Sequence, residues 1–350
     1  MEPFNAESPP RLLLQSLVTP AELLYVRNHG GVPEVDGASY RLAVGGKLGR
    51  PLELSLEDLT ERFARVTVEA TLNCAGNRRN QLIEVAPIPG EVPWRDGAIG
   101  TGSWAGARLG DVLAAARVDP GARHVSFVGL DEVEADGQVV NFGGSIPLAK
   151  ALHPETLLAY QLNGAALPPV HGFPVRLLVP GYIGARSVKW LSRITVQADP
   201  SANYFQARAY KLFPSSARPE TVDWDGGVML GEMPVNAAIC RPGDGETVPS
   251  GQALVEGWAI AGGERLVARV DVSRDAGESW HEAELAEPNR AWTWCFWRIR
   301  LELEPGPCEL VVRAWDSAAN TQPEDPAKIW NLKGYVNNAW HRVGITVAPL

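Results

Sequence analysis

Residues 71–79 read Thr-Leu-Asn-Cys-Ala-Gly-Asn-Arg-Arg, and the interpretation of the chain starts from them. Just before them, Val66-Thr67-Val68-Glu69-Ala70 alternates in the manner of a strand, so we expect Cys74 at a strand end, in a glycine-containing turn. Two arginines follow closely, and nearby positive charge favours the thiolate, the form that binds metals or attacks electrophiles. The alternative is a small core residue, because free cysteine is among the most buried residue types.

Two other segments concentrate donors and cations. Residues 25–33, Tyr-Val-Arg-Asn-His-Gly-Gly-Val-Pro, place arginine, asparagine and histidine on one loop, a set suited to an anionic ligand. Residues 171–190 hold a histidine and several cations, interrupted by glycines that let backbone N–H groups approach a phosphate. Each segment alone also fits a solvated turn with surface charges. Neither a Walker loop nor a dinucleotide-binding glycine pattern is present.

Composition limits the classes of protein that need to be considered. A chain of 350 residues favours two domains, and 45% hydrophobic with 21% charged residues is typical of a globular protein. The net charge of -9 argues against general nucleic-acid binding, although a local cationic pocket remains compatible with it. No stretch approaches the ~20 apolar residues of a membrane span, so no membrane partner is expected.

The termini and cysteines bear on the cellular compartment. Residues 1–17 lack a positive segment followed by an apolar run, so we expect no signal peptide and a cytoplasmic location, or a periplasmic one only if a leader has been removed. The four cysteines, at positions 74, 240, 295 and 308, form no CxxC pair. A disulfide framework or a zinc site is therefore not predicted.

The predicted secondary structure changes near residue 235. Before it, helix signals mix with strand signals: helix starts are predicted at Thr19-Pro20 and Ser55-Leu56-Glu57-Asp58, and helical apolar spacing at residues 108–116. After it, short strands with Gly/Pro punctuation predict a sandwich. The expected features there are strands at residues 267–273, 292–300 and 308–315 and a hairpin turn at residues 275–277.

Taken together, the motifs resemble the sulfite oxidase family. The resemblance covers the chain from about residue 20 to its end. It is carried by Arg27-Asn28-His29, Cys74-Ala75-Gly76-Asn77-Arg78-Arg79, Ala98-Ile99-Gly100, Trp104-Ala105-Gly106-Ala107-Arg108-Leu109, Gly144-Ser145-Ile146-Pro147-Leu148, His171-Gly172-Phe173-Pro174-Val175-Arg176, Gly184-Ala185-Arg186-Ser187-Val188-Lys189-Trp190-Leu191 and Ile329-Trp330-Asn331-Leu332-Lys333-Gly334 continuing to Asn338-Ala339-Trp340-His341-Arg342-Val343.

The resemblance implies an α+β fold with two domains. A mixed α/β molybdopterin-binding domain is expected over residues 1–235, in which residues 201–235 connect the domains and contribute Tyr210. An all-β immunoglobulin-like sandwich is expected over residues 236–350. In the family this second domain serves dimerisation, so the resemblance implies a symmetric homodimer.

The resemblance also implies a molybdenum-molybdopterin cofactor. Cys74 then matches the protein ligand to the metal, a soft thiolate suited to a metal already held by a dithiolene. The cations and backbone amides would take the phosphate, and the carboxylate and histidine would bond the pterin edges. The residues that match the family's cofactor contacts are Tyr25, Val26, Arg27, Asn28, His29, Asp131, His171, Arg176, Ser187, Val188 and Lys189.

The implied reaction is oxygen-atom transfer that oxidises sulfite to sulfate, and guanidinium groups suit a small dianion. The matching substrate-site residues are Arg27, Arg79, Trp94, Tyr210 and Lys333. No haem module is expected, so electrons would leave to an external acceptor, either oxygen or a cytochrome. Two alternatives stay open: a nitrate or S-oxide reductase of the same superfamily, and a catalytically inactive homologue that acts as a binding protein.

Three positions depart from the family pattern. Lys333 stands where the animal and plant sulfite oxidases usually have arginine. Lysine keeps the positive charge but loses the bidentate hydrogen bonding of a guanidinium group. Phe142 stands where relatives often have tyrosine. Ala209 stands where they often have an acidic residue, next to Tyr210, so slow turnover or an unusual substrate is compatible with the sequence.

Overall fold

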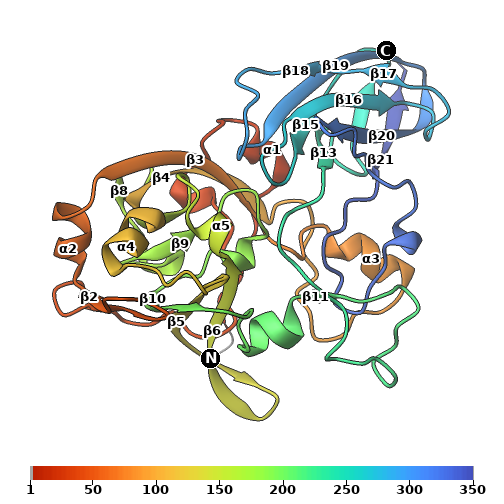
Figure 1. Cartoon of the computed structure of the whole chain (residues 1–350). Helices are drawn as coiled ribbons and strands as arrows, with labels where there is room; N and C mark the ends of the chain where they lie inside the picture. The colour runs from red at the N-terminus through yellow and green to blue at the C-terminus, as the bar shows by residue number, and fades with distance from the viewer. Residues whose placement is uncertain (1–2, 350) are drawn as a thin grey trace.

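The computed structural model describes residues 3–349, which form two lobes (Figure 1). The first lobe combines two sheets with short helices, and the second lobe, drawn in blue, is built from two further sheets. The predicted fold class, an α+β domain followed by an all-β sandwich, is confirmed. The predicted boundary at residue 235 falls between β12 (Val228–Met229) and β13 (Asn236–Arg241) and stays a prediction.

Both sheets of the first lobe have five strands. One sheet has the order β2-β1-β10-β5-β6, in which only β1 and β10 run parallel. The other has the order β3-β4-β7-β8, with β9 also paired to β7. The strands are β1 (Leu42–Gly46), β2 (Leu52–Leu54), β3 (Arg65–Asn73), β4 (Ile99–Arg108), β5 (His124–Ala135), β6 (Gln138–Pro147), β7 (Leu157–Leu162), β8 (Ala165–Ala166), β9 (Arg176–Leu178) and β10 (Leu191–Gln197).

The helices are short. The α-helices are α1 (Pro10–Leu13), α2 (Leu56–Glu61), α3 (Arg79–Val85), α4 (Leu109–Ala116) and α5 (Leu148–Ala151), and the 3-10 and π segments are η1 (Ala21–Leu23), η2 (Pro169–His171), η3 (Gly184–Arg186), η4 (Phe205–Ala209) and η5 (Pro326–Lys328). The predicted start of α2 is confirmed: Asp58 N donates to Ser55 Oγ at 3.0 Å, and Ser55 N donates to Asp58 Oδ2 at 2.9 Å. These reciprocal bonds satisfy backbone donors that the helix itself leaves free.

The second lobe contains a four-stranded and a five-stranded sheet, with the orders β13-β15-β19-β18 and β14-β21-β20-β16-β17. Its remaining strands are β14 (Thr247–Pro249), β15 (Gly251–Ile260), β16 (Val267–Ser273), β17 (His281–Glu282), β18 (Glu284–Leu285), β19 (Cys295–Leu303), β20 (Gly306–Asp316) and β21 (His341–Ala348). A two-stranded ribbon of β11 (Lys211–Leu212) and β12 precedes this lobe.

One strand boundary in the second lobe differs from the sequence prediction. The strand expected at residues 292–300 begins only at Cys295. Trp292 has a positive φ of 74° and packs with the apolar cluster around Trp104 in the first lobe. Trp292 O accepts from Thr71 N at 2.7 Å, and Trp294 N donates to Thr71 Oγ1 at 2.8 Å. The aromatic residues before β19 therefore join the lobes, and this long-range packing overrides the local alternation.

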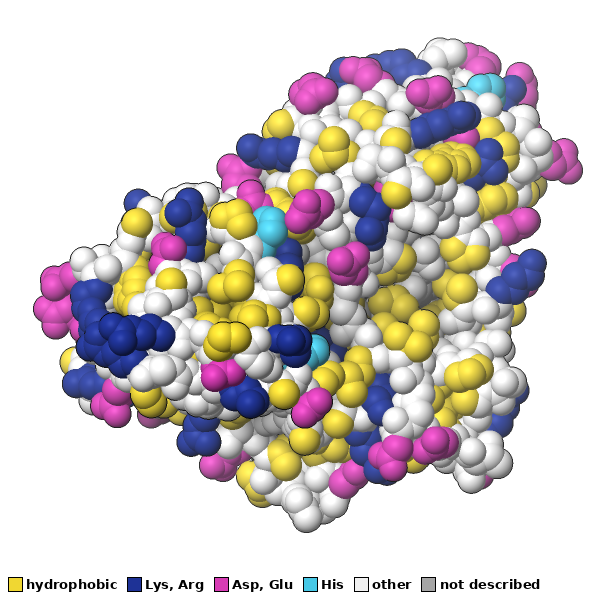
Figure 2. Space-filling view, in the orientation of Figure 1, with side chains coloured by type: hydrophobic (Ala, Val, Ile, Leu, Met, Phe, Trp, Pro, Cys, Tyr) yellow, Lys and Arg dark blue, Asp and Glu magenta, His cyan; other side chains and the backbone are white. Residues whose placement is uncertain are grey.

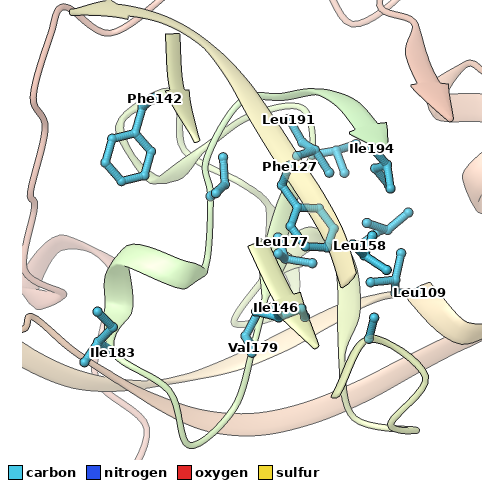
Figure 3. Close-up of a cluster of buried hydrophobic side chains, with 14 of the residues drawn as sticks. Leu109, Phe127, Phe142, Ile146, Leu158, Leu177, Val179, Ile183, Leu191 and Ile194 are labelled. Carbon is cyan, nitrogen blue, oxygen red and sulfur yellow. The ribbon is translucent and has the colours of Figure 1, made fainter. Parts of the chain in front are cut away.

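The largest apolar core lies inside the first lobe and extends into the second. Figure 3 shows Phe127 of β5 among labelled side chains from β7 and β9, with Phe142 of β6 standing apart from them. The same cluster contains Trp258 and Trp294 of the second lobe, both fully buried. Burying a large apolar side chain contributes about 1.5–3 kcal/mol. The two lobes are therefore stabilised by a shared core, which keeps the site region fixed relative to the sandwich.

Candidate functional site

The sheet geometry places Cys74 immediately after β3. The antiparallel pairing of β3 with β4 ends at Asn73, and Cys74 N donates to Ala98 O at 2.9 Å. The chain then turns back, and Gly76 N donates to Cys74 Sγ at 3.4 Å. The strand-to-turn prediction is therefore confirmed. Burial raises the pKa of the Cys74 thiol, while the charges of Arg79 and Arg27 and the bond from Gly76 act against that rise.

Cys74 lines a pocket together with most of the cofactor residues proposed from the sequence. Those that share the pocket are Tyr25, Arg27, Asn28, His29, Asp131, His171, Arg176, Ser187 and Lys189. Tyr210, predicted as a substrate-site residue, lines it too. The lining residues that sequence reasoning did not assign to the site are Leu24, Leu72, Ala75, Phe142, Gly184, Ala185 and Trp190. The three motif segments around residues 27, 74 and 171–190, which are far apart in the chain, thus line one pocket.

Two of the proposed cofactor residues do not line this pocket. Val26 forms an isolated bridge with Ala6, with backbone bonds of 2.8 and 3.0 Å. Val188 is 1% exposed, and its carbonyl accepts from Leu177 N at 2.8 Å. In this structure, both fix the backbone beside residues that do line the pocket.

The cations of the pocket are held by backbone carbonyls. Arg176 donates to His171 O and to Ser187 O, both at 3.0 Å. Lys189 donates to Val170 O at 3.0 Å and to the side chain of Asn28. Burial lowers the pKa of Arg176 to about 10 and lowers that of Lys189 well below its ordinary value. A nearby anion would relieve this penalty, because opposite charge stabilises the charged form of a buried cation.

A carboxyl group on the pocket wall lacks a partner. Asp131 is 4% exposed, and its Oδ1 makes no hydrogen bond. Burial raises the pKa of Asp131 to about 6. A Cβ at Gly129 would lie 2.5 Å from this oxygen, so glycine leaves room for it. Buried acceptors of this kind are ordinarily bonded, so the site fits a ligand that presents N–H donors, as a pterin edge does.

His29 and Tyr210 form a second polar contact in the pocket. The distance from Tyr210 Oη to His29 Nε2 is 3.1 Å, and the His29 ring stacks on Phe142 with centroids 4.9 Å apart. Burial and then the charges of Arg27 and Lys189 lower the pKa of His29, so its ring stays neutral. Burial also raises the pKa of Tyr210, which keeps its hydroxyl protonated.

The other three proposed substrate residues lie beside the pocket and do not line it. Trp94 is 3% exposed, packs against Cys74 and has an unbonded Nε1. Arg79 and Lys333 both pair with Glu91, at 3.5 and 3.0 Å. Sequence reasoning missed Glu91. It also missed Tyr335, whose ring stacks on Tyr210 at 5.0 Å and lies 5.2 Å from Arg79 Cζ.

The residues present fit a molybdenum-pterin group. Within residues 3–349, no three His, Cys, Asp or Glu side chains gather as a metal site. Cys74 could hold a metal only if the other ligands came with the metal, as the dithiolene of a pterin supplies them. The cations Arg27, Arg176 and Lys189 suit a phosphate, and the unbonded oxygen of Asp131 suits the ring.

Two family models match the chain. The "Oxidoreductase molybdopterin binding domain" matches residues 29–205, and the "Mo-co oxidoreductase dimerisation domain" matches residues 228–348. Sulfite oxidase from Arabidopsis thaliana is 40% identical over 98% of this chain and 91% of its own length. The chain belongs to the sulfite oxidase family.

Other family members match over different shares of their length. The mitochondrial sulfite oxidase of Homo sapiens is 48% identical over 99% of this chain, which spans 65% of that protein. Among solved structures, the sulfane dehydrogenase SoxCD from Paracoccus pantotrophus aligns with a TM-score of 0.81 at 26% identity. That alignment covers 96% of this chain and 82% of the other. Both lobes therefore have the family fold.

The desolvated carboxyl of Asp131 predicts a pH-dependent effect on stability. The unfolded chain ionises this group near the ordinary value of 3.8, and burial raises the pKa to about 6 in the folded protein. Between these two pKa values the folded state binds more protons than the unfolded chain. The contribution of Asp131 to the free energy of unfolding therefore falls as pH rises, and it stays lower above pH 6. The substitution Asp131→Asn removes the titrating carboxyl group and, with it, this loss of stability at higher pH. In cofactor-free protein, we expect the variant to gain on the order of 2 kcal/mol over wild type between pH 4 and pH 8.

Urea unfolding of both proteins at pH 4, 6 and 8 measures this difference. Comparing the two proteins at each pH cancels the other titrating groups. A difference that stays constant with pH would show that Asp131 is not the desolvated group.

Proposed function

We propose that this chain binds a molybdenum-pterin cofactor through Cys74 and oxidises sulfite to sulfate. One observation carries the proposal: Cys74 lies in a pocket with Arg27, Arg176 and Lys189, beside the unbonded carboxyl of Asp131. When bound, the cofactor supplies the two-electron redox chemistry of oxygen-atom transfer. The residues of this chain bind the cofactor, position the anion and set the charge around both.

The proposed roles follow from the contacts. Cys74 Sγ would hold the metal, and Asp131 would accept hydrogen bonds from the pterin. The neutral His29 orients the Tyr210 hydroxyl at 3.1 Å, so that this O–H can donate to an oxygen at the reacting centre. Because burial raises the pKa of Tyr210, the hydroxyl acts as a hydrogen-bond donor and not as a base at neutral pH.

The proposed substrate is an oxyanion because the cations around Tyr210 outnumber the carboxylates. Arg27, Arg79 and Lys333 are the candidate anion ligands, and Glu91 is the carboxylate that pairs with two of them. When sulfite gains an oxygen from water, two electrons and the two protons of the water are released. These electrons leave to an external acceptor, oxygen or a cytochrome, and we propose no haem in this chain.

An assay panel on purified protein tests the proposed function. We expect molybdenum and pterin in the protein, sulfite-dependent reduction of an added acceptor, and bleaching of a visible absorption band by sulfite. Nitrite formation from nitrate without sulfite oxidation would favour the reductase alternative. Absence of both molybdenum and pterin would favour a binding protein.

Homodimer formation is a further prediction. The second lobe matches the dimerisation domain of the family, so we expect a symmetric pair built mainly by residues 236–350. Light scattering at micromolar concentration should give about twice the chain mass of 37.8 kDa. A mass equal to one chain would contradict this prediction.

No single sign of charge dominates the face of the molecule seen in Figure 2. Acidic and basic side chains are interspersed across the face in Figure 2. None of the helices in residues 3–349 combines the length and apolar character of a bilayer-crossing segment. The cytoplasmic location expected from the sequence stays a prediction.

A further inference from the structure

Glu91 lies between two cations of the proposed substrate site. Its Oε2 is 3.5 Å from Arg79 Nη2, and its Oε1 is 3.0 Å from Lys333 Nζ. The side chains of Arg79, Glu91 and Lys333 are 2%, 12% and 24% exposed, so the triad is largely shielded from water. Coulomb interactions in such a setting are stronger than at an open surface.

The rest of the Arg79 guanidinium is already engaged. Arg79 Nε donates to Lys333 O at 2.9 Å, and Nη1 donates to Val92 O at 2.7 Å. A Cβ at Gly76 would lie 2.5 Å from Arg79 Cζ, so the guanidinium is packed against the turn that carries Cys74. Arg79 therefore cannot swing to a ligand without losing bonds. Its Nη2, which points at Glu91, is the donor available to an incoming anion.

The loop that carries Glu91 is anchored on its C-terminal side. Asn80 N donates to Trp94 O at 3.0 Å, and Arg78 N donates to Arg95 O at 2.7 Å. These bonds tie residues 94 and 95 to the turn after Cys74. Glu91 therefore faces its cations from an anchored loop and not from a free surface segment.

The triad adjoins the reacting centre. The Tyr335 ring lies 5.2 Å from Arg79 Cζ on one side and stacks on Tyr210 at 5.0 Å on the other. The charge of Glu91 contributes to the raised pKa of Tyr210, after the larger effect of burial. An anion placed near Tyr210 would therefore experience the Glu91 carboxylate as well as the two cations.

We propose that Glu91 is a specificity-determining residue that competes with the oxyanion for Arg79 and Lys333 and so weakens anion binding. The proposal rests on the proposed function, because it concerns the same anion site. Carboxylate oxygens and sulfite or sulfate oxygens accept from the same guanidinium and ammonium donors. Neutralising Glu91 frees those donors and removes a repulsion that grows with the charge of the ligand. A dianion therefore gains more than a monoanion.

Calorimetric titration of the purified holoprotein with sulfate and with nitrate tests this competition. We expect Glu91→Gln to bind sulfate about tenfold more tightly than wild type, and nitrate only about threefold more tightly. Glu84→Gln is the matched control, since it removes the same charge from an exposed residue of α3 that pairs with neither cation among the described contacts. We expect its sulfate affinity to stay within about twofold of wild type.

Other outcomes of the titration would overturn the proposal. Unchanged or weaker sulfate binding in Glu91→Gln would show that Glu91 anchors the cations in place and does not compete. Equal gains for sulfate and nitrate, or no sulfate binding in either protein, would also overturn the proposal. If Glu91→Gln fails to fold, Glu91→Asp decides: its shorter carboxylate reaches the cations less well, so sulfate should bind more tightly than in wild type.

The two hypotheses fail separately. Sulfite turnover with unaltered sulfate affinity in Glu91→Gln would reject the role of Glu91 and leave the proposed function standing. Tighter sulfate binding by Glu91→Gln, in a protein that does not oxidise sulfite, would support the role of Glu91 and reject the proposed function.

Discussion

Replacing Cys74 by serine is expected to abolish sulfite-dependent turnover while the protein stays folded. Even the loss of a group that only orients a metal ligand typically costs about 10–100-fold, so loss of the ligand itself should exceed roughly 100-fold. A serine hydroxyl is a poor substitute because it is hard, weakly acidic and not ionised at neutral pH. The visible absorption band that depends on the sulfur–metal bond should disappear together with the activity.

The fold should tolerate the change because Cys74 lies at the pocket wall and not deep in the apolar core. Its side chain is 8% exposed, and Gly76 N can donate to a serine oxygen as it does to Sγ. We expect the free energy of unfolding to fall by about 1 kcal/mol or less. Cys240→Ser is the matched control: it alters a buried cysteine outside the pocket and should leave the absorption band in place. Substantial sulfite turnover by Cys74→Ser would reject the ligand assignment.

The local features around Cys74 could be predicted because they depend on neighbouring residues. Alternation predicted β3, and the glycine after the cysteine predicted the turn. The start of α2 followed from Ser55 and Asp58, whose capping bonds span three residues. The convergence of three distant segments on one pocket depended on family resemblance, since no local pattern brings residue 27 to residue 189.

The sequence alone could not distinguish the roles of the two adjacent arginines. Arg78 and Arg79 are adjacent and chemically identical, and both were expected to supply charge near the thiol. Arg78 adopts a left-handed φ of 63°, so the two side chains leave the backbone in different directions. Arg79 turns toward the substrate region, whereas Arg78 crosses to Asn236 in the second lobe. That division depends on a lobe whose first strand begins more than 150 residues later.

Glu91 was missed for a related reason. It lies in the segment Pro87-Ile88-Pro89-Gly90-Glu91-Val92-Pro93, which has no helical or strand period to orient a side chain. Its partner Lys333 is 242 residues away along the chain. A carboxylate in a proline-rich loop ordinarily indicates a solvated surface group, and only the packed structure pairs it with the buried Arg79 and the half-buried Lys333.

Replacing Arg78 by methionine is expected to cost about 3 kcal/mol of stability. Arg78 is fully buried, and its guanidinium donates to Asn236 Oδ1 at 2.6 Å, to Ala339 O at 2.8 Å and to Gln81 Oε1 at 2.9 Å. Methionine fills similar space but leaves these acceptors without their donor, and each buried unsatisfied group costs about 1–3 kcal/mol. The sum is reduced because each acceptor keeps another donor. Asn337 Nδ2 donates to Gln81 at 3.0 Å, and Gln322 Nε2 lies 3.1 Å from Ala339 O and 3.5 Å from Asn236 Oδ1.

The loss should also change how the lobes unfold, because these bonds join the turn after Cys74 to β13 and to the segment before β21. Urea unfolding followed by tryptophan fluorescence and circular dichroism should show a lower midpoint and a wider separation between the two signals than in wild type. Arg95→Met is the control: it removes an exposed arginine from the opposing loop and should cost no more than about 0.5 kcal/mol. If Arg78→Met were as stable as that control, the shared apolar core and the Thr71 hydrogen bonds would be enough to hold the lobes together, and the buried guanidinium would contribute nothing to their union.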